Sequence, residues 1–176
     1  MLEGIPDGTA PVLVPQFTLK DGGRLMPLAF IKDVKVDEGA AQTTVMYRQT
    51  EMDRLGSSAP VADARLSVQT SYRLRANRIE RTDVFTPAGS LDLNSVRLEF
   101  ATFSQDPKQD GMITRFGSGA VTSFSVEGLQ SCTSRKLDHD HDYASDTGPM
   151  TALVICTSGP WRLDHPLTIH WAIDYK

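Results

Sequence analysis

Apolar and polar residues alternate with a period of two along much of the chain. Residues 65–75 show this pattern first, with Thr70 on the apolar side. The other apolar positions of this segment are Leu66, Val68, Tyr72 and Leu74. Successive side chains of a strand point to opposite faces of its sheet, so the pattern predicts a half-buried strand with one wet face. Ala76-Asn77 fits a tight turn, because Asn tolerates left-handed backbone, and residues 78–86 are expected to form the hairpin partner.

The same alternation predicts strands on both sides of this hairpin. The clearest is the last, residues 167–175, in which the alternation is unbroken. The other expected strands cover residues 11–20, 24–36, 43–49, 91–104, 112–116, 120–126, 129–134 and 150–157. Residues 52–60 and 106–111 are expected to be loops, because Gly, Ser, Pro and Asp gather there.

Helical periodicity is missing from the sequence, since no window of about twelve residues carries apolar positions at helical spacing behind a start cap. About ten strands with regular turn signals favour an all-β, antiparallel β-sandwich with little helix. No repeat or linker interrupts the pattern. We therefore expect a single β-sandwich domain over residues 1–176.

The amino-acid composition argues against two classes of binding partner, nucleic acids and membranes. The chain has 18 Lys and Arg against 22 Asp and Glu, a formal net charge of -4, which removes broad attraction to nucleic acids or anionic membranes. No stretch approaches the roughly 18 apolar residues of a membrane-spanning helix, so neither nucleic-acid binding nor membrane insertion is expected. The first residues have neither a basic nor an apolar leader region, and no secretion signal is predicted.

The two cysteines leave two interpretations open. Cys132 and Cys156 are too few for a disulfide framework and lack the CxxC spacing of zinc or thioredoxin-like sites. They are either buried thiols or a single bridge between neighbouring strands, formed in an oxidising compartment. A processed or truncated domain would be periplasmic or secreted; otherwise the chain would be cytoplasmic.

The densest polar cluster follows residue 137. In an extended segment Asp138, Asp140 and Asp142 share one side, and His139 and His141 share the other. Three carboxylates suit Ca²⁺, and two imidazoles suit Zn²⁺ or Ni²⁺, although the glycine and distant Glu of an EF-hand loop are missing. The alternative is a solvated loop without a ligand. We expect no cofactor, with Ca²⁺ as the candidate metal.

Arginines on the hairpin are candidate contacts for carbohydrate. Arg73, Arg75 and Arg81, with Arg78 between them, would bind a carboxylated polymer from one wet face, because guanidinium pairs with carboxylates in a bidentate manner. Interleaved acidic residues such as Glu80 offer a second explanation, cross-strand ion pairing without a ligand.

Two further candidates lie near the C-terminus. Trp161 follows Gly159-Pro160 in an expected turn, where it would either stack on a sugar ring or close the end of a core. His170 is expected on the polar face of the last strand, as a carbohydrate contact or a solvated histidine. No nucleophile elbow, dinucleotide-binding glycine motif or P-loop accompanies these residues.

Residues 71–83, 98–103 and 167–175 resemble the β-sandwich portion of heparinase II/III-like polysaccharide lyases. The resemblance covers roughly residues 25–176 and implies a many-stranded, supersandwich-like fold from a bacterial carbohydrate-processing protein. In that family a helical toroid forms much of the substrate cleft. Since no helical region of that size is predicted here, no catalytic residue is carried over.

Three functional hypotheses follow. The leading one is a non-catalytic module whose partner is an acidic polysaccharide or another protein domain. The second is a lyase or hydrolase with a site on the sheet face around Tyr72, Arg73, His139, His141 and His170, in which His or Tyr acts as base and Arg neutralises a uronate. The third is an assembly protein that pairs through the edge of its final strand.

Overall fold

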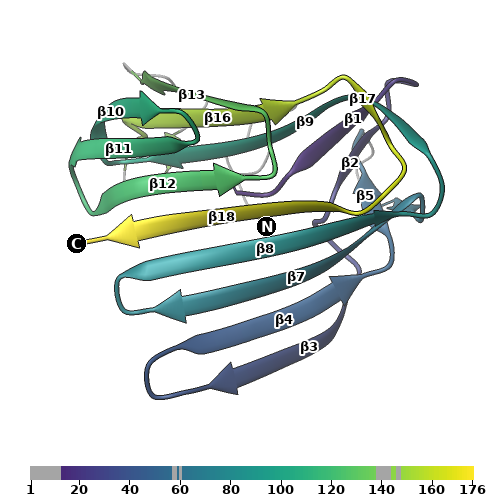
Figure 1. Cartoon of the computed structure of the whole chain (residues 1–176), viewed down its shortest axis with the longest axis horizontal. Coiled ribbons are helices and arrows are strands. Elements are labelled where there is room, and N and C mark those ends of the chain that lie inside the picture. Colours follow the sequence, from purple (N-terminus) through teal and green to yellow (C-terminus); the bar gives the residue numbers. More distant parts are fainter. Residues whose placement is uncertain (1–12, 57–58, 60, 138–143, 146–147) are drawn as a thin grey trace.

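The computed structural model describes residues 13–56, 59, 61–137, 144–145 and 148–176 (Figure 1). This part of the chain consists of strands, turns and loops, and it contains no helix that could cross a membrane. Two antiparallel sheets of eight strands each account for most of it. The predicted all-β sandwich is confirmed.

The first sheet is built from both halves of the chain. Its strands are β1 (Gln16–Leu19), β2 (Arg24–Met26), β5 (Met52–Arg54), β6 (Ala62–Asp63), β9 (Leu91–Thr102), β13 (Ser131–Lys136), β16 (Ala152–Ser158) and β17 (Trp161–Leu163). Their order is β13-β16-β9-β1-β2-β5-β6, and β17 also pairs with β9.

The second sheet has the order β10-β11-β12-β18-β8-β7-β4-β3. Its strands are β3 (Ile31–Glu38), β4 (Thr43–Gln49), β7 (Leu66–Arg75), β8 (Arg78–Pro87), β10 (Gln105–Asp110), β11 (Ile113–Ser118), β12 (Val121–Glu127) and β18 (Leu167–Tyr175). A separate two-stranded sheet joins β14 (Ala144–Ser145) and β15 (Gly148–Pro149).

Aromatic contacts connect the inner faces of the two sheets. The rings of Phe17 and Phe85 are 4.7 Å apart between centroids, and those of Phe100 and Phe124 are 4.6 Å apart. Each pair joins a strand of the first sheet to a strand of the second, and the three phenylalanines at positions 17, 85 and 124 are almost completely buried. Burial of such large apolar side chains supplies the main driving force for this fold.

The predicted hairpin is confirmed. β7 and β8 pair around the two-residue turn Ala76-Asn77, and the apolar face identified from the sequence is the one that turns inward. The final strand is confirmed as well, since β18 covers residues 167–175. It lies between β12 and β8 (Figure 1), so the expectation that it offers a free edge is wrong. Its alternation reflects a central strand, whose inner face is buried in the core.

Short strands account for the differences from the predicted elements. Both expected loops contain a strand: β5 begins the segment 52–60, and β10 covers residues 105–110. β5 has three residues, too few for alternation to be visible. β10 contains Pro107 and lies at the sheet edge, where a residue without an N–H is tolerated. Such segments raise the strand number above the expected ten.

The cysteines form a disulfide. Cys132 on β13 and Cys156 on β16 lie directly opposite each other in the ladder, and their Cα atoms are 4.0 Å apart. The bridge therefore joins two neighbouring strands, as in the second of the two interpretations left open by the sequence.

Candidate functional site

Three neighbouring strands, β7, β8 and β18, divide the candidate residues between the two faces of the second sheet. Tyr72 pairs with Arg81, and Arg81 pairs with Trp171; these side chains face inward. Arg73 pairs with Glu80 on the outer face, together with Arg75, Arg78 and His170. The expectation that all the hairpin arginines share one wet face is therefore wrong for Arg81. The two-residue turn places it opposite Tyr72 rather than opposite an outward-facing residue.

The outer-face cluster consists of Arg73, Arg75, Arg78, Glu80 and Asp174. Glu80 Oε2 lies 3.8 Å from Arg73 Nη1 and 3.6 Å from Arg75 Nη1, and Glu80 Oε1 lies 3.3 Å from Arg78 Nε. Arg78 also donates to Asp174 at 2.6 Å. The predicted cross-strand ion pairing is thus present. Three guanidinium groups share two carboxylates, which leaves one excess positive charge on this cluster.

Asp174 is the second acidic group of the outer-face cluster. Its burial raises the pKa of the carboxyl, but hydrogen bonds from Ser123 and Arg78 outweigh that effect, so the pKa lies below its ordinary value. Asp174 is therefore an ionised carboxylate that holds Arg78 in place.

His170 lies beside the same cluster. Its Nδ1 is 2.9 Å from the Thr82 hydroxyl, and the ring is half-buried. A small hollow of about 70 Å³ opens between His170 and Arg73, with Thr44 and Ser71 also in its wall. The structure thus brings together three of the five carbohydrate candidates, Arg73, Arg75 and His170, on one face.

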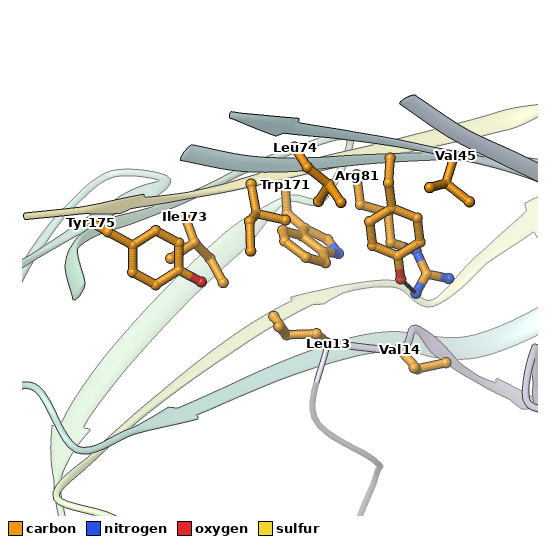
Figure 2. A pocket seen from close by; sticks show the side chains of 10 residues that line it. Leu13, Val14, Val45, Leu74, Arg81, Trp171, Ile173 and Tyr175 are labelled. Carbon is orange, nitrogen blue, oxygen red and sulfur yellow. Dashed lines mark hydrogen bonds between the residues drawn. The ribbon is translucent and has the colours of Figure 1, made fainter. Parts of the chain in front are cut away.

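A larger pocket lies on the inner face of the same three strands. It has a volume of about 520 Å³ and is lined mainly by apolar and aromatic side chains. Figure 2 shows Leu13 and Val14 facing Trp171 and Arg81 across this hollow. The lining residues are Leu13, Val14, Val45, Tyr72, Leu74, Ile79, Arg81, Trp171, Ile173 and Tyr175.

Arg81 is held at the wall of this pocket by several bonds. Its Nε donates to both carboxylate oxygens of Asp83, at 3.0 and 2.8 Å, and its Nη1 donates to the Tyr72 hydroxyl at 2.7 Å. Thr70 donates to Asp83 at 2.7 Å. Burial raises the pKa of Asp83, while the facing guanidinium and the Thr70 hydroxyl oppose that shift.

The lyase hypothesis draws on residues that the structure separates. The Tyr72 hydroxyl bonds to Arg81 on the inner face, whereas Arg73 and His170 belong to the outer face. Burial raises the pKa of Tyr72 to about 12, which disfavours the ionised form that would take a proton. His139 and His141 lie outside the described residues.

The remaining candidates lie elsewhere. Trp161 is part of β17 in the first sheet, is half-buried and packs against the core. The acidic candidates Asp138, Asp140 and Asp142 fall outside the described residues. Among the residues that are described, no group of three or more His, Cys, Asp and Glu could hold a metal ion.

Sequence reasoning missed the inner pocket, although a signal was present. Arg81 and Asp83 stand at alternate positions of a strand whose other inward positions, Ile79 and Phe85, are apolar. Charged residues at positions expected to be buried are costly unless they are paired, so their presence indicates a polar network inside the sandwich.

Comparisons with known proteins give a fold likeness only. No protein-family model matches the sequence, and no curated protein matches it either. The structure is similar to that of heparan sulfate lyase HepC from Pedobacter heparinus, with a TM-score of 0.47 and 8% identity over 82% of this chain. A mutant of the same lyase gives 0.45 and 10% over 83%. This chain spans 22% of the length of either lyase chain. The resemblance to polysaccharide lyases noted in the sequence is therefore found in the structure as a weak likeness.

Proposed function

We propose that this chain is a non-catalytic β-sandwich module that binds an acidic polysaccharide through the outer face of β7, β8 and β18. The observation that carries the proposal is the arrangement of Arg73 and Arg75 around Glu80. Both guanidinium groups lie more than 3.5 Å from Glu80 Oε2, too far for a good hydrogen bond, and their side chains are 52% and 41% exposed. Arg75 Nε donates to Gln42 Oε1 at a long 3.5 Å, and the Nη1 groups of both arginines remain available to an incoming anion.

The chemistry of this face suits a carboxylated or sulfated sugar chain. Arg73 and Arg75 stand two positions apart on one strand, which spaces them roughly 7 Å apart along it. Guanidinium groups form paired hydrogen bonds with carboxylates and related oxyanions. His170 and the hydroxyls beside the small hollow supply further polar contacts for sugar hydroxyls.

The disulfide supports placing the module in an oxidising compartment. Structural disulfides persist in periplasmic and secreted proteins and are rare where thiols are kept reduced. An extracellular or periplasmic location would expose the outer-face cluster to polysaccharide.

Calorimetric titration with uronic-acid oligosaccharides tests the proposal. We expect binding that weakens with added salt and falls at least about tenfold in Arg73→Ala/Arg75→Ala, because each lost charge-assisted contact contributes more than a neutral hydrogen bond. Arg115→Ala is the matched control, since it removes an exposed arginine of β11 that pairs with Asp110. No binding at millimolar ligand, or equal loss in the control, would contradict the proposal.

An ultraviolet absorbance assay tests separately whether the module is non-catalytic. Cleavage of a uronate chain by elimination yields unsaturated products that absorb ultraviolet light. We expect no absorbance increase on a panel of uronic-acid polymers. An increase that disappears in His170→Ala would replace the binding module by a lyase whose site includes that residue.

A further inference from the structure

The inner pocket between the sheets contains two buried hydrogen-bond donors without partners. Arg81 and Trp171 are 3% and 2% exposed. Within the described part of the chain, Arg81 Nη2 and Trp171 Nε1 have no hydrogen-bond partner. Buried polar groups in proteins are almost always satisfied, so two orphaned donors in one pocket indicate a missing acceptor.

The two unpartnered donors lie on neighbouring strands, on residues that pair directly. Arg81 and Trp171 pair directly across β8 and β18, and Tyr72 pairs with Arg81 on the other side. Directly opposed side chains on neighbouring strands lie about 5 Å apart at Cβ. The guanidinium is also fixed, because Asp83 and Tyr72 hold its other nitrogens and its carbon lies 5.2 Å from the Tyr72 ring centre.

The remaining wall of the pocket is apolar apart from the hydroxyl groups of Tyr72 and Tyr175. Leu13 and Val14 face the donors across the hollow (Figure 2), and Leu74, Ile79 and Ile173 complete an aliphatic lining. The lining residues other than the buried Arg81, Trp171 and Ile173 are half-buried, which leaves the pocket open towards solvent with its donors at the buried end. A volume of about 520 Å³ lies in the range of small-molecule sites, roughly 300–1,000 Å³.

We propose that this pocket binds a small amphiphile with an apolar body and a single carboxylate head, which accepts hydrogen bonds from Arg81 Nη2 and Trp171 Nε1. An ionised carboxylate only accepts hydrogen bonds, so it matches the two unpartnered buried groups of this site, which only donate. An alcohol or amide head would bring donors of its own, and a sugar would bring many hydroxyls against an aliphatic wall. Asp83 does not repel the head strongly, because both of its oxygens bond to Arg81 behind the pocket surface.

Calorimetric titration with decanoate, and with decanol as the uncharged match, tests this proposal. We expect one decanoate site, and decanol at least about tenfold weaker, since hydrogen bonds to charged groups contribute more than neutral ones. Trp171→Phe removes the indole N–H, keeps an aromatic ring and should weaken decanoate about tenfold. Trp161→Phe, the same change outside the pocket, should leave the affinity unchanged.

Val45→Trp gives a second, independent variant, because it adds bulk at the half-buried wall of the pocket. It should abolish decanoate binding while near-ultraviolet circular dichroism shows a folded protein. Absence of decanoate binding at millimolar concentration, equal affinity for decanol, or binding that survives Val45→Trp would overturn the proposal. Arg73→Ala/Arg75→Ala should not change decanoate binding, which separates this site from the polysaccharide face.

Discussion

Arg81 and Asp83 form a charged pair inside the sandwich, with 3% and 0% of their side chains exposed. Removing two charges from water is expensive, and close pairing repays the cost only when the remaining groups are also satisfied. Asp83 meets that condition through Thr70 and Arg81. Arg81 meets it in part, because its Nη2 has no partner among the described residues. This unpartnered N–H group is one of the two that would donate to the carboxylate of the proposed ligand.

Arg81→Met tests the burial of this pair. The variant leaves Asp83 without its cation, so we expect the free energy of unfolding to fall by about 3–5 kcal/mol in urea denaturation at neutral pH. Arg81→Met/Asp83→Leu should recover much of the loss, because no unpaired charge remains. Arg115→Met, on the exposed surface, should stay within about 0.5 kcal/mol of wild type. A single variant as stable as that control would show that Asp83 is not a buried charge.

Asp174 predicts how stability depends on pH. Its folded-state pKa lies below its ordinary value, so the unfolded chain binds the proton more readily. The stabilisation is complete above the unfolded pKa and is lost as pH falls through the folded pKa. We expect the melting temperature of Asp174→Asn to be lower than wild type at pH 6, with the gap closing towards pH 3. Asp37→Asn, on the exposed β3, is the control, and a gap of constant size would contradict this role of Asp174.

Among the strands, the number of residues in each decided which ones could be predicted from the sequence. β7, β8, β9 and β18 have nine or more residues each, enough for alternation to appear on both faces. β2, β5 and β17 have three residues each, too few for alternation to appear, and β17 pairs with the distant β9. The central position of β18 was equally hidden, because a strand at the end of a chain gives no indication of its neighbours.

The disulfide links β13 and β16, two neighbouring strands of the first sheet. The bridge closes a loop with a sequence separation of 24, for which loop-closure entropy predicts a stabilisation of about 3.5 kcal/mol. We expect Cys132→Ala/Cys156→Ala to lose about that amount in urea denaturation. Reduction of the wild-type protein should produce a similar loss, and the double variant should not respond to reductant. Wild-type stability that is unchanged by a reductant would contradict a structural bridge.

At the scale of the whole molecule, the sequence predicted the architecture better than the site. Alternation and the lack of helical periodicity were sufficient for the sandwich and for the polar outer face. The separation of Arg81 from Arg73 and Arg75 was predictable, because Arg81 alternates with the apolar Ile79 and Phe85 and the two-residue turn pairs it with Tyr72. The inner pocket depends on Leu13 and Val14 lying opposite β18, segments that are far apart in the sequence.

The proposed function requires the outer face of β7, β8 and β18 to bind acidic polysaccharide. The most direct measurement is a titration of the isotope-labelled chain with a uronic-acid oligosaccharide, followed by the NMR shifts of its backbone amides. We expect the largest shifts around Arg73, Arg75 and His170, and we expect them to disappear in Arg73→Ala/Arg75→Ala. No shifts at millimolar oligosaccharide, or shifts centred on the first sheet, would contradict it.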